Sequence, residues 1–442
     1  MRTTRPKLAA LLSFIWPGLG QAGQGRLWRG AVQALPQLLA LAVLLLALLM
    51  VGPLVLVAYL FNPVLSLGLF IALSLLGVWH AWSIVDAIGW RLGATSTRLW
   101  ATSLVAVVFV VHAWLGSSLI AFYQSGTVIY QPPPTGISPS PGTSLAPGQT
   151  LPPGGPGQTD PPGPPLPGAD DRVTVLLVGI DNTHGDALAL TDTLIVASFD
   201  PRNGSLVMIS LPRDTARLPM YSGGTFLPRV NQLRQSATRY PELYPDGPMG
   251  TLVNEMSYLI GVQIDYYAII GIAGFAQLID AVGGVDIVAE QSVDDPGYQF
   301  SPTEVGFFID AGPHHLDGKY ATAYARSRHG SSDYARARRQ QQILLALRDR
   351  LRDPFVYMNI PGILNGVAAV VRTNAPLDRW PEIVQIAERS RDADTRHLVL
   401  SPPRYAGHVI GDLGPTSMTQ LDMDAVAELS IELFGSDSRY AP

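Results

Sequence analysis

Five arginines are concentrated in one stretch of the C-terminal half, "TAYARSRHGSSDYARARRQQ" (residues 322–341), although the whole chain has a formal net charge of -5. They are Arg326, Arg328, Arg336, Arg338 and Arg339. The planar guanidinium group donates paired hydrogen bonds to phosphate or carboxylate oxygens. A run of charge is also typical of a solvated helix face. The spacing of the arginines helps to choose between these two interpretations.

A turn divides the arginines into two groups. Arg326 and Arg328 end one predicted helix, "HGSSD" forms the turn, and Asp333 is the expected N-cap of the next helix. On that next helix three polar side chains, at positions i, i+3 and i+4, share one face: Arg336, Arg339 and Gln340. Arg338 points elsewhere and is expected to be solvated. Two arginine groups facing each other across a tight turn would repel without an anion between them, which favours a phosphate-binding site.

A second polar cluster, "SLPRDT", follows a predicted strand. Arg213 and Asp214 end this motif, and Arg217 lies four residues beyond Arg213. An arginine at a strand end can bind a phosphate or a carboxylate. It can equally form a local ion pair with the neighbouring aspartate. Both interpretations fit these residues.

Two acidic residues flank the loop between the first two predicted strands. Asp181 closes the first strand and Asp192 opens the second, after a loop that contains His184 and Asp186. Ligands of open α/β sheets bind at strand ends, and two carboxylates there can hold a divalent cation such as magnesium. Aspartate at a strand end is also common as a turn or capping residue.

Composition and motif context exclude several other kinds of chemistry. The chain has no cysteine, which excludes disulfides, thiolate catalysis and zinc-thiolate sites. "GLGQAG" (residues 18–23) matches a dinucleotide-binding pattern, but "WP" precedes it where a strand is required, and no acid follows before Asp86. We therefore interpret its glycines as a membrane-helix boundary. No nucleic-acid partner is expected, because a nucleic-acid groove needs basic residues spread over a broad surface.

The candidate site residues require an α/β fold to position them. "VTVLLVGID" (residues 173–181) is an unbroken apolar run of strand length, as expected for a buried strand. Further strands are expected at "TLIVASFD", "SLVMISLP", "DYYAIIG", "GVDIVAE" and "RHLVLS". Helices are expected at "TLVNEMSYLIG", "IAGFAQLIDAV" and residues 316–327, 334–352, 379–391 and 420–434. This alternation, with one hairpin, predicts an α/β/α sandwich around a mixed central sheet.

Residues 1–159 have the composition of a membrane region, with seven basic residues and one acidic residue within long apolar runs. Three stretches are long enough to cross a bilayer as helices, namely residues 33–61, 64–85 and 99–122. "AALLSFIWPGLGQAG" is too short to span and is expected to be interfacial or re-entrant. The basic residues lie before the first span and in the second loop, whereas the first loop, around "FNP", carries no charge, so the positive-inside rule places the N-terminus and the second loop in the cytoplasm. We therefore expect a multi-pass protein of the cell membrane, embedded in the lipid bilayer, with its C-terminal domain outside the cytoplasm.

Proline, glycine, serine and threonine dominate residues 131–168, a composition that predicts an unstructured linker. The chain beyond residue 159 carries 23 basic and 34 acidic residues and is typical of a soluble domain. The predicted organisation is a bundle of about three transmembrane helices (1–123), a linker (124–170), an α/β domain (171–436) and a short tail (437–442).

Several motifs in order make residues 175–347 resemble the LytR-CpsA-Psr family. They are "LLVGID", "TDTLIVASFDP", "ISLPRDT", "RVNQL", "IDYYAIIG", "LIDAVGGVDI" and "HHLDGKYATAYARSRHGSSDYARARRQQQILLAL". The resemblance implies a magnesium-dependent phosphotransferase of the bacterial envelope. Such enzymes take a glycopolymer from a polyprenyl-diphosphate carrier and attach it to peptidoglycan through a phosphodiester bond.

The resemblance also implies roles by position. Asp181 and Asp192 match the acids associated with magnesium, and Arg213 matches the catalytic and diphosphate-binding arginine of the "PRDT" motif. The remaining diphosphate-binding set matches Arg326, Arg328, Arg336 and Gln340. The chain departs from the pattern at Leu190, where many relatives carry an arginine. Arg217 and Arg339 are the candidate replacements for that missing contact with the diphosphate.

The implied reaction needs a base and a slot for the lipid. Asp192 is the candidate base for the acceptor hydroxyl. "LVNEMSYLIG" and "QILLAL" are candidate walls of an apolar slot for the lipid tail, although ordinary core packing also accounts for such residues.

Three other functions are compatible with these residues. A non-enzymatic, membrane-anchored envelope regulator would show no turnover of a lipid diphosphate. A polyprenyl-diphosphate hydrolase would use the same site with water as acceptor, so that the product phosphate would appear in solution. A polyanion-binding envelope module would tolerate the loss of either acid.

Overall fold

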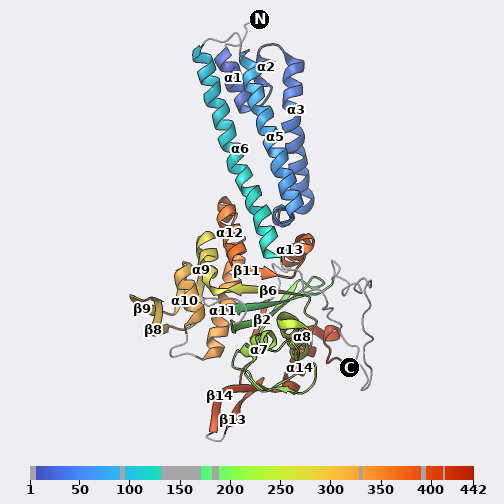
Figure 1. Cartoon of the computed structure of the whole chain (residues 1–442), viewed down its shortest axis with the longest axis vertical. Helices are drawn as coiled ribbons and strands as arrows, with labels where there is room; N and C mark the ends of the chain where they lie inside the picture. Colours follow the sequence, from blue (N-terminus) through green and yellow to red (C-terminus); the bar gives the residue numbers. More distant parts are fainter. Residues whose placement is uncertain are drawn as a thin grey trace. The chain divides into compact units, whose positions relative to one another are not determined.

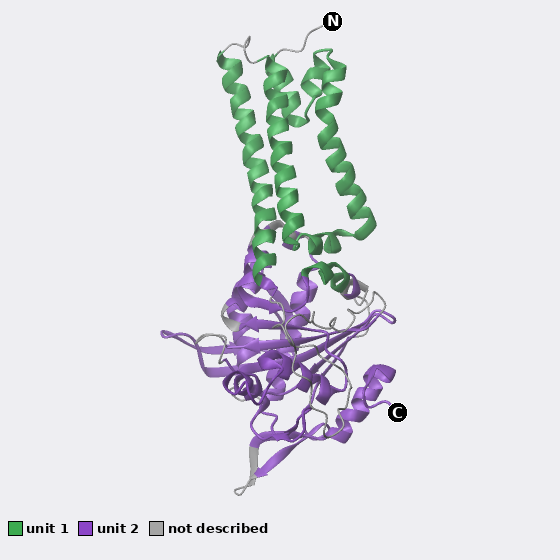
Figure 2. Cartoon of the chain, turned by 45° about the vertical axis from the view of Figure 1, so that its right-hand side comes forward, with its two compact units in different colours: residues 1–128, 377–384 green, residues 129–376, 385–442 purple. Residues whose placement is uncertain are grey.

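The computed structural model describes residues 6–89, 95–130, 171–181, 189–327, 332–389, 395–411 and 414–442. Residues 131–170 of the predicted linker (124–170) lie outside this described part of the chain, whereas residues 124–129 are helical, which corrects the start of the linker. The chain forms two units, residues 1–128 with 377–384, and residues 129–376 with 385–442 (Figure 2). We call the first the membrane unit and the second the C-terminal unit.

Apolar helices make up the membrane unit (Figure 1). In chain order they are α1 (Pro6–Ile15), α2 (Leu19–Gly23), α3 (Leu27–Val51), α4 (Pro53–Tyr59), α5 (Pro63–Ile88) and α6 (Thr95–Ile129). Helices α3, α5 and α6, with 25, 26 and 35 residues, are long and apolar enough to cross a membrane, which confirms the three predicted spans. The boundaries differ from the prediction. The first span ends before Gly52, whose φ of 80° interrupts the helix, and α6 continues past residue 123.

The segment predicted to be interfacial forms α1 and α2, which pack against α3 and α5. The Gln21 side chain donates to the Ser83 carbonyl at 2.9 Å and to the Asp86 carboxylate at 3.1 Å, and Gln33 donates to the same Asp86 oxygen at 2.9 Å. A Cβ atom on Gly18 would lie 2.0 Å from a carbonyl oxygen of Gly30. The glycines of "GLGQAG" therefore permit close helix packing, and a helix rather than a strand precedes them.

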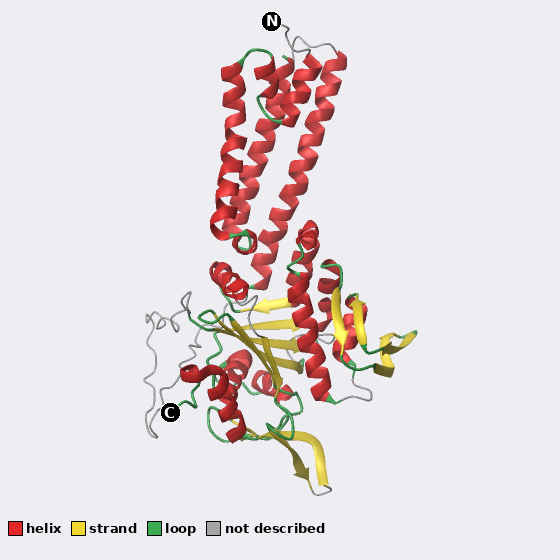
Figure 3. Ribbon diagram, turned by 180° about the vertical axis from the view of Figure 1, so that it is seen from behind, coloured by secondary structure: helices red, strands yellow, loops and turns green. Residues whose placement is uncertain are grey.

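A six-stranded mixed sheet is the centre of the C-terminal unit, in the order β11-β6-β1-β2-β3-β12 (Figure 3). Its strands are β1 (Val173–Ile180), β2 (Thr191–Asp200), β3 (Ser205–Ser210), β6 (Tyr266–Gly271), β11 (Val371–Thr373) and β12 (Thr395–Val399). Strand β1 runs antiparallel to β2 and parallel to β6, and β12 runs parallel to β3. The predicted mixed sheet is confirmed.

Helices cover both faces of this sheet, as expected for an α/β/α sandwich (Figure 3). Those on the first face are α7 (Leu233–Arg239), α8 (Gly247–Ile260) and α14 (Met423–Phe434). Those on the second face are α9 (Ile272–Ala281), α10 (Gly318–Arg326) and α11 (Asp333–Arg350). Successive strand residues point to opposite faces. Leu176 and Val178 are therefore buried against α8, whereas Leu177 packs toward Leu344 of α11.

The remaining elements belong neither to the central sheet nor to the helices on its faces. The C-terminal unit also has helix α12 (Ile360–Val370) and short 3-10 turns at Val230–Gln232, Pro354–Asn359 and Gly435–Asp437. The 3-10 turn Leu377–Arg379 and the start of helix α13 (Trp380–Arg389) belong to the membrane unit. Four two-stranded sheets pair β4 (Leu218–Pro219) with β5 (Thr225–Phe226), β7 (Val285–Ala289) with β10 (Gly312–Leu316), β8 (Val293–Ser301) with β9 (Glu304–Ile309), and β13 (Ala406–Gly411) with β14 (Gly414–Leu421). The predicted strand "GVDIVAE" is thus β7, which pairs outside the central sheet.

The predicted tail is part of the fold. The Tyr440 hydroxyl donates to the carbonyls of Tyr258 and Leu259 at 3.0 and 3.2 Å, and the Arg439 N–H donates to the Gly261 carbonyl at 2.8 Å. These bonds fasten the C-terminus to the end of α8.

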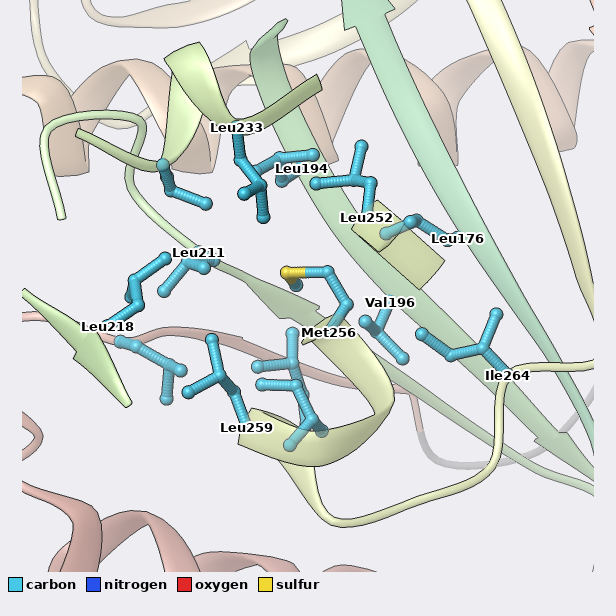
Figure 4. Close-up of a cluster of buried hydrophobic side chains, with 14 of the residues drawn as sticks. Leu176, Leu194, Val196, Leu211, Leu218, Leu233, Leu252, Met256, Leu259 and Ile264 are labelled. Carbon is cyan, nitrogen blue, oxygen red and sulfur yellow. The ribbon is translucent and has the colours of Figure 1, made fainter. Parts of the chain in front are cut away.

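A carboxyl group is buried in helix α8, beside the main core (Figure 4 shows this core). Glu255 is 0% exposed, and its Oε2 atom accepts the Tyr221 N–H at 3.1 Å. Burial raises the pKa of Glu255 to about 7, although the Tyr221 N–H and the charge of Arg439 oppose the shift. Its neutral form is therefore the form that the fold tolerates best.

We expect Glu255→Gln to stabilise the protein above neutral pH. Native protein retains a proton on Glu255 that the unfolded chain releases between pH 4.5 and about 7, so the wild-type free energy of unfolding falls as pH rises through this window. The variant lacks this loss and should gain about 3 kcal/mol relative to wild type between acidic and mildly alkaline pH. Urea unfolding of the full-length protein in detergent measures the difference.

Glu242→Gln is the matched control, because Glu242 is exposed. Its stability relative to wild type should stay constant over the same pH range. Parallel curves for Glu255→Gln and wild type would contradict the assignment of a protonated, buried Glu255.

Candidate functional site

A cavity of about 220 Å³ lies between the second face of the sheet and helices α9, α10 and α11. Its polar lining consists of Asp192, Thr193, Arg213, Thr322, Arg326, Arg336 and Gln340. Its apolar lining includes Leu177, Ile270, Phe275, Ile343 and Leu344. Five predicted site residues therefore meet in one cavity, from segments of the chain that are far apart in sequence.

Only one of the two segments predicted as apolar walls lines the cavity. "QILLAL" supplies Ile343 and Leu344 of α11, which line the cavity. For "LVNEMSYLIG" the alternative, ordinary core packing, is confirmed, because this segment is α8 on the opposite face of the sheet. Its residues Leu252, Met256 and Leu259 are 0% exposed in the main core (Figure 4). Helical periodicity identifies an apolar face but not the side of the sheet that it covers.

Each arginine of the polar lining is paired with a carboxylate. The shortest N–O distances are 2.5 Å for Arg213–Asp192, 3.1 Å for Arg326–Asp181 and 3.1 Å for Arg336–Asp333. Arg336 is 5% exposed, so its positive charge lies in a largely dehydrated place. A buried guanidinium without a counter-charge would be strongly destabilising. The acids therefore hold the guanidinium groups in place.

The two acids predicted to bind magnesium lie at one end of the hairpin β1–β2. Ile180 pairs with Thr191 and Gly179 with Thr193, so the register shifts at this point and Asp192 forms a bulge. Asp181 follows Ile180 directly. His184 and Asp186 of the intervening loop lie outside the described residues.

This donor set fits a magnesium ion. The described residues contain no group of three or more His, Cys, Asp or Glu side chains that could hold a metal. Two carboxylates at one sheet end nevertheless provide hard oxygen ligands. Magnesium is commonly bound by one or two carboxylates, with phosphate oxygens and water as the other ligands.

Of the predicted ligands of the diphosphate that the structure describes, Arg217 and Arg339 do not line the cavity. Arg328 lies outside the described residues. Arg217 is exposed, with a φ of 53°, on the loop before β4. Arg339 is 7% exposed and donates to the carbonyls of Tyr324 and Ser327 at 2.8 and 2.5 Å.

The position of Arg339 corrects the prediction that it replaces the contact missing at Leu190. Residues i, i+3 and i+4 span roughly 100° around a helix. Arg336 and Gln340 occupy the part of that arc that faces the cavity, whereas Arg339 faces the end of α10.

A pair of carboxyl groups beside the site was not recognised in the sequence. Asp214 hydrogen-bonds the side chain of Asp333, and each also binds an arginine, Arg229 and Arg336 respectively, at 3.1 Å. Burial and the Asp333 carboxyl raise the pKa of Asp214 to about 6, against the charges of Arg229 and Arg213. The sequence contains a hint of this pair, since each acid lies within three residues of a predicted ligand arginine.

The N-terminus of α11 also differs from the prediction. Ser332, not Asp333, is the N-cap, and its hydroxyl accepts the Ala335 N–H at 3.2 Å. Asp333 is the first helical residue, where the positive end of the helix dipole stabilises a carboxylate.

We expect the charge of Asp214 to weaken anion binding above pH 6. Asp214→Asn keeps the shape of the side chain and cannot ionise. The ratio of the wild-type to the variant dissociation constant for inorganic pyrophosphate should rise about fivefold between pH 5 and pH 7.5, as wild type gains a negative charge. Isothermal titration calorimetry at each pH measures this ratio, in which the titration of pyrophosphate itself cancels.

Asp349→Asn is the control, because Asp349 is an exposed acid on α11, the helix that carries Asp333. Its ratio should not change with pH. A constant ratio for Asp214→Asn would exclude electrostatic coupling between Asp214 and the anion site.

Comparisons with known proteins give relatives of this chain. It is 31% identical over 217 residues to "Polyisoprenyl-teichoic acid--peptidoglycan teichoic acid transferase TagU" of Halalkalibacterium halodurans, which is 49% of this chain and 65% of the relative. It is 28% identical over 211 residues to "Regulatory protein MsrR" of Staphylococcus aureus, or 47% of this chain and 58% of the relative. The chain thus covers less than two thirds of either curated relative.

A solved structure and a family model also match this chain. The crystal structure of TagV from B. subtilis matches 62% of this chain and 99% of that chain, with a TM-score of 0.48 and 24% identity. The model of the LytR_cpsA_psr family matches residues 158–439, which is more than half of the chain. The chain therefore belongs to the LytR_cpsA_psr family.

Proposed function

We propose that the C-terminal unit transfers a glycopolymer from a polyprenyl-diphosphate carrier to peptidoglycan through a phosphodiester bond. The observation that carries this proposal is the combination of three arginines and an apolar lining in one cavity. Arginine suits the oxygens of a diphosphate, and the leucine, isoleucine and phenylalanine side chains suit a lipid tail. The name of the TagU relative is consistent with this substrate class.

In the proposed reaction, the arginines bind the diphosphate and disperse its negative charge. An acceptor hydroxyl of peptidoglycan attacks the phosphorus that carries the sugar. A new phosphorus–oxygen bond forms to the acceptor, the bridging phosphorus–oxygen bond breaks, and polyprenyl phosphate leaves. The lining arginines stabilise the charge that develops on this leaving group.

The hydroxyl proton requires a base. Asp192 is the acid of the described residues that lines the cavity, and one of its carboxylate oxygens accepts a hydrogen bond from Arg213. We assign the proton to Asp192. Asp181 and Asp192 would hold a magnesium ion, which when bound would add positive charge beside the diphosphate.

The proposed topology follows from the basic flanks of the membrane helices. The N-terminus lies in the cytoplasm, α3, α5 and α6 cross the lipid bilayer, and the C-terminal unit lies outside, where peptidoglycan is found.

Arg336→Ala is expected to abolish transfer. It removes a buried guanidinium from the polar lining and leaves Asp333 without its arginine, so we expect at least a hundredfold loss of activity. The assay follows a labelled lipid-linked glycopolymer onto peptidoglycan in the presence of full-length protein. Arg338→Ala, an exposed arginine of the same helix, is the control and should transfer at the wild-type rate.

The same assay separates the alternative functions. Label released into solution as a phosphorylated glycan would identify a hydrolase. No turnover by wild type would support a non-enzymatic regulator. Wild-type transfer by Arg336→Ala would refute the assigned site.

Transfer is expected to depend on magnesium. Excess chelator should abolish it, and added Mg²⁺ should restore it, because the charge beside the diphosphate is lost and regained. Asp181→Asn should require a higher Mg²⁺ concentration for half-maximal activity, whereas Asp192→Asn, which also removes the assigned base, should stay inactive at every Mg²⁺ concentration. Undiminished transfer in excess chelator would contradict the magnesium site.

A further inference from the structure

The C-terminal end of helix α10 is held by side chains of the neighbouring helix. Helix α10 ends at Arg326, and the last four carbonyls of a helix lack partners within it. The Arg339 guanidinium donates to the carbonyl of Tyr324 at 2.8 Å, and the Gln340 amide donates to the carbonyl of Ala325 at 3.3 Å. Both donors come from α11. The positive charge of Arg339 at this position also interacts favourably with the negative end of the helix dipole.

The residue after α10 is held from two further directions. Ser327 is 0% exposed, and its hydroxyl donates to the Asp295 carboxylate of strand β8 at 2.8 Å. Its carbonyl accepts from Arg339 at 2.5 Å. Asp295 and Arg339 are each 7% exposed. Burying two charged groups is costly unless they make good hydrogen bonds.

We call Asp295, Ser327 and Arg339 the buried clamp. The clamp lies at the C-terminal end of helix α10, next to an arginine of the anion site. Arg326 lies in the last turn of α10 and lines the cavity. The chain leaves the helix at Ser327, whose ψ of 136° is extended. A small displacement of this corner would move the Arg326 guanidinium away from the cavity, and misplacement by about 1 Å can be costly for catalysis.

We infer that Asp295 and Arg339 are positioning residues, which hold the end of α10 so that Arg326 presents its guanidinium to the diphosphate. Neither side chain lines the described cavity. Arg339 therefore acts through the backbone of residues 324–327, and Asp295 acts through the Ser327 hydroxyl. The inference rests on the proposed function, because the proposed function makes Arg326 a ligand of the diphosphate.

Arg339→Met tests the inference, since it keeps an unbranched side chain and removes the donors. The probe is inorganic pyrophosphate, titrated into full-length protein by calorimetry. We expect the affinity for pyrophosphate, and kcat/KM for transfer, to fall about tenfold with the helical content unchanged. Arg338→Met, an exposed neighbour on the same helix, should match wild type.

A double-mutant cycle distinguishes positioning from general destabilisation. If Arg339 acts through Arg326, then Arg339→Met should weaken pyrophosphate binding only slightly further in an Arg326→Ala background. Losses that multiply in the double variant would overturn the inference.

Ser327→Ala is a second route to the same answer if Arg339→Met does not fold. It removes the donor to Asp295 and should lower the affinity for pyrophosphate about threefold, an effect that should again disappear in the Arg326→Ala background. An unchanged affinity would overturn the role of Asp295. If wild type binds pyrophosphate but does not transfer a glycopolymer, the proposed function alone is refuted. If wild type does not bind pyrophosphate, both the proposed function and this inference are refuted.

Discussion

The pairing of each cavity arginine with a carboxylate is the interaction on which the site depends. Three such pairs are present, Arg213–Asp192, Arg326–Asp181 and Arg336–Asp333. Three guanidinium groups around one cavity repel one another, and burial of a charge without a partner is strongly unfavourable. The acids offset this cost and keep the guanidinium groups oriented. In the proposed reaction an incoming diphosphate supplies the same compensation, which frees Asp181 and Asp192 to bind a metal.

Strand β1 joins the stability of the C-terminal unit to its proposed chemistry. Alternate residues point to opposite faces of the sheet, so Leu176 and Val178 lie in the main core while Leu177 and Gly179 line the cavity. A Cβ atom on Gly179 would lie 2.8 Å from the Thr193 side chain, so a larger residue is excluded there. The floor of the cavity is therefore backed by close packing, and the bulge at its end presents Asp192.

The turn between α10 and α11 connects the two arginine groups. Helix α10 ends without a glycine cap, and side chains of α11 satisfy its carbonyls instead. The helix that carries Arg336 and Gln340 thus also holds the end of the helix that carries Arg326. Asp295 adds a third element, β8, through Ser327. The two halves of the polar lining are consequently parts of one hydrogen-bonded arrangement.

The sequence by itself determined the three membrane helices, the mixed sheet and the family, because hydropathy, periodicity and motif order are local properties. It also placed Arg213, Arg326, Arg336 and Gln340 among the candidate ligands. Only the tertiary structure decided that Arg339 binds carbonyls, that α8 lies on the far face of the sheet, and that Asp214 contacts Asp333. A helical face about 100° wide can meet two different neighbours, and which neighbour each side chain meets is decided by long-range packing.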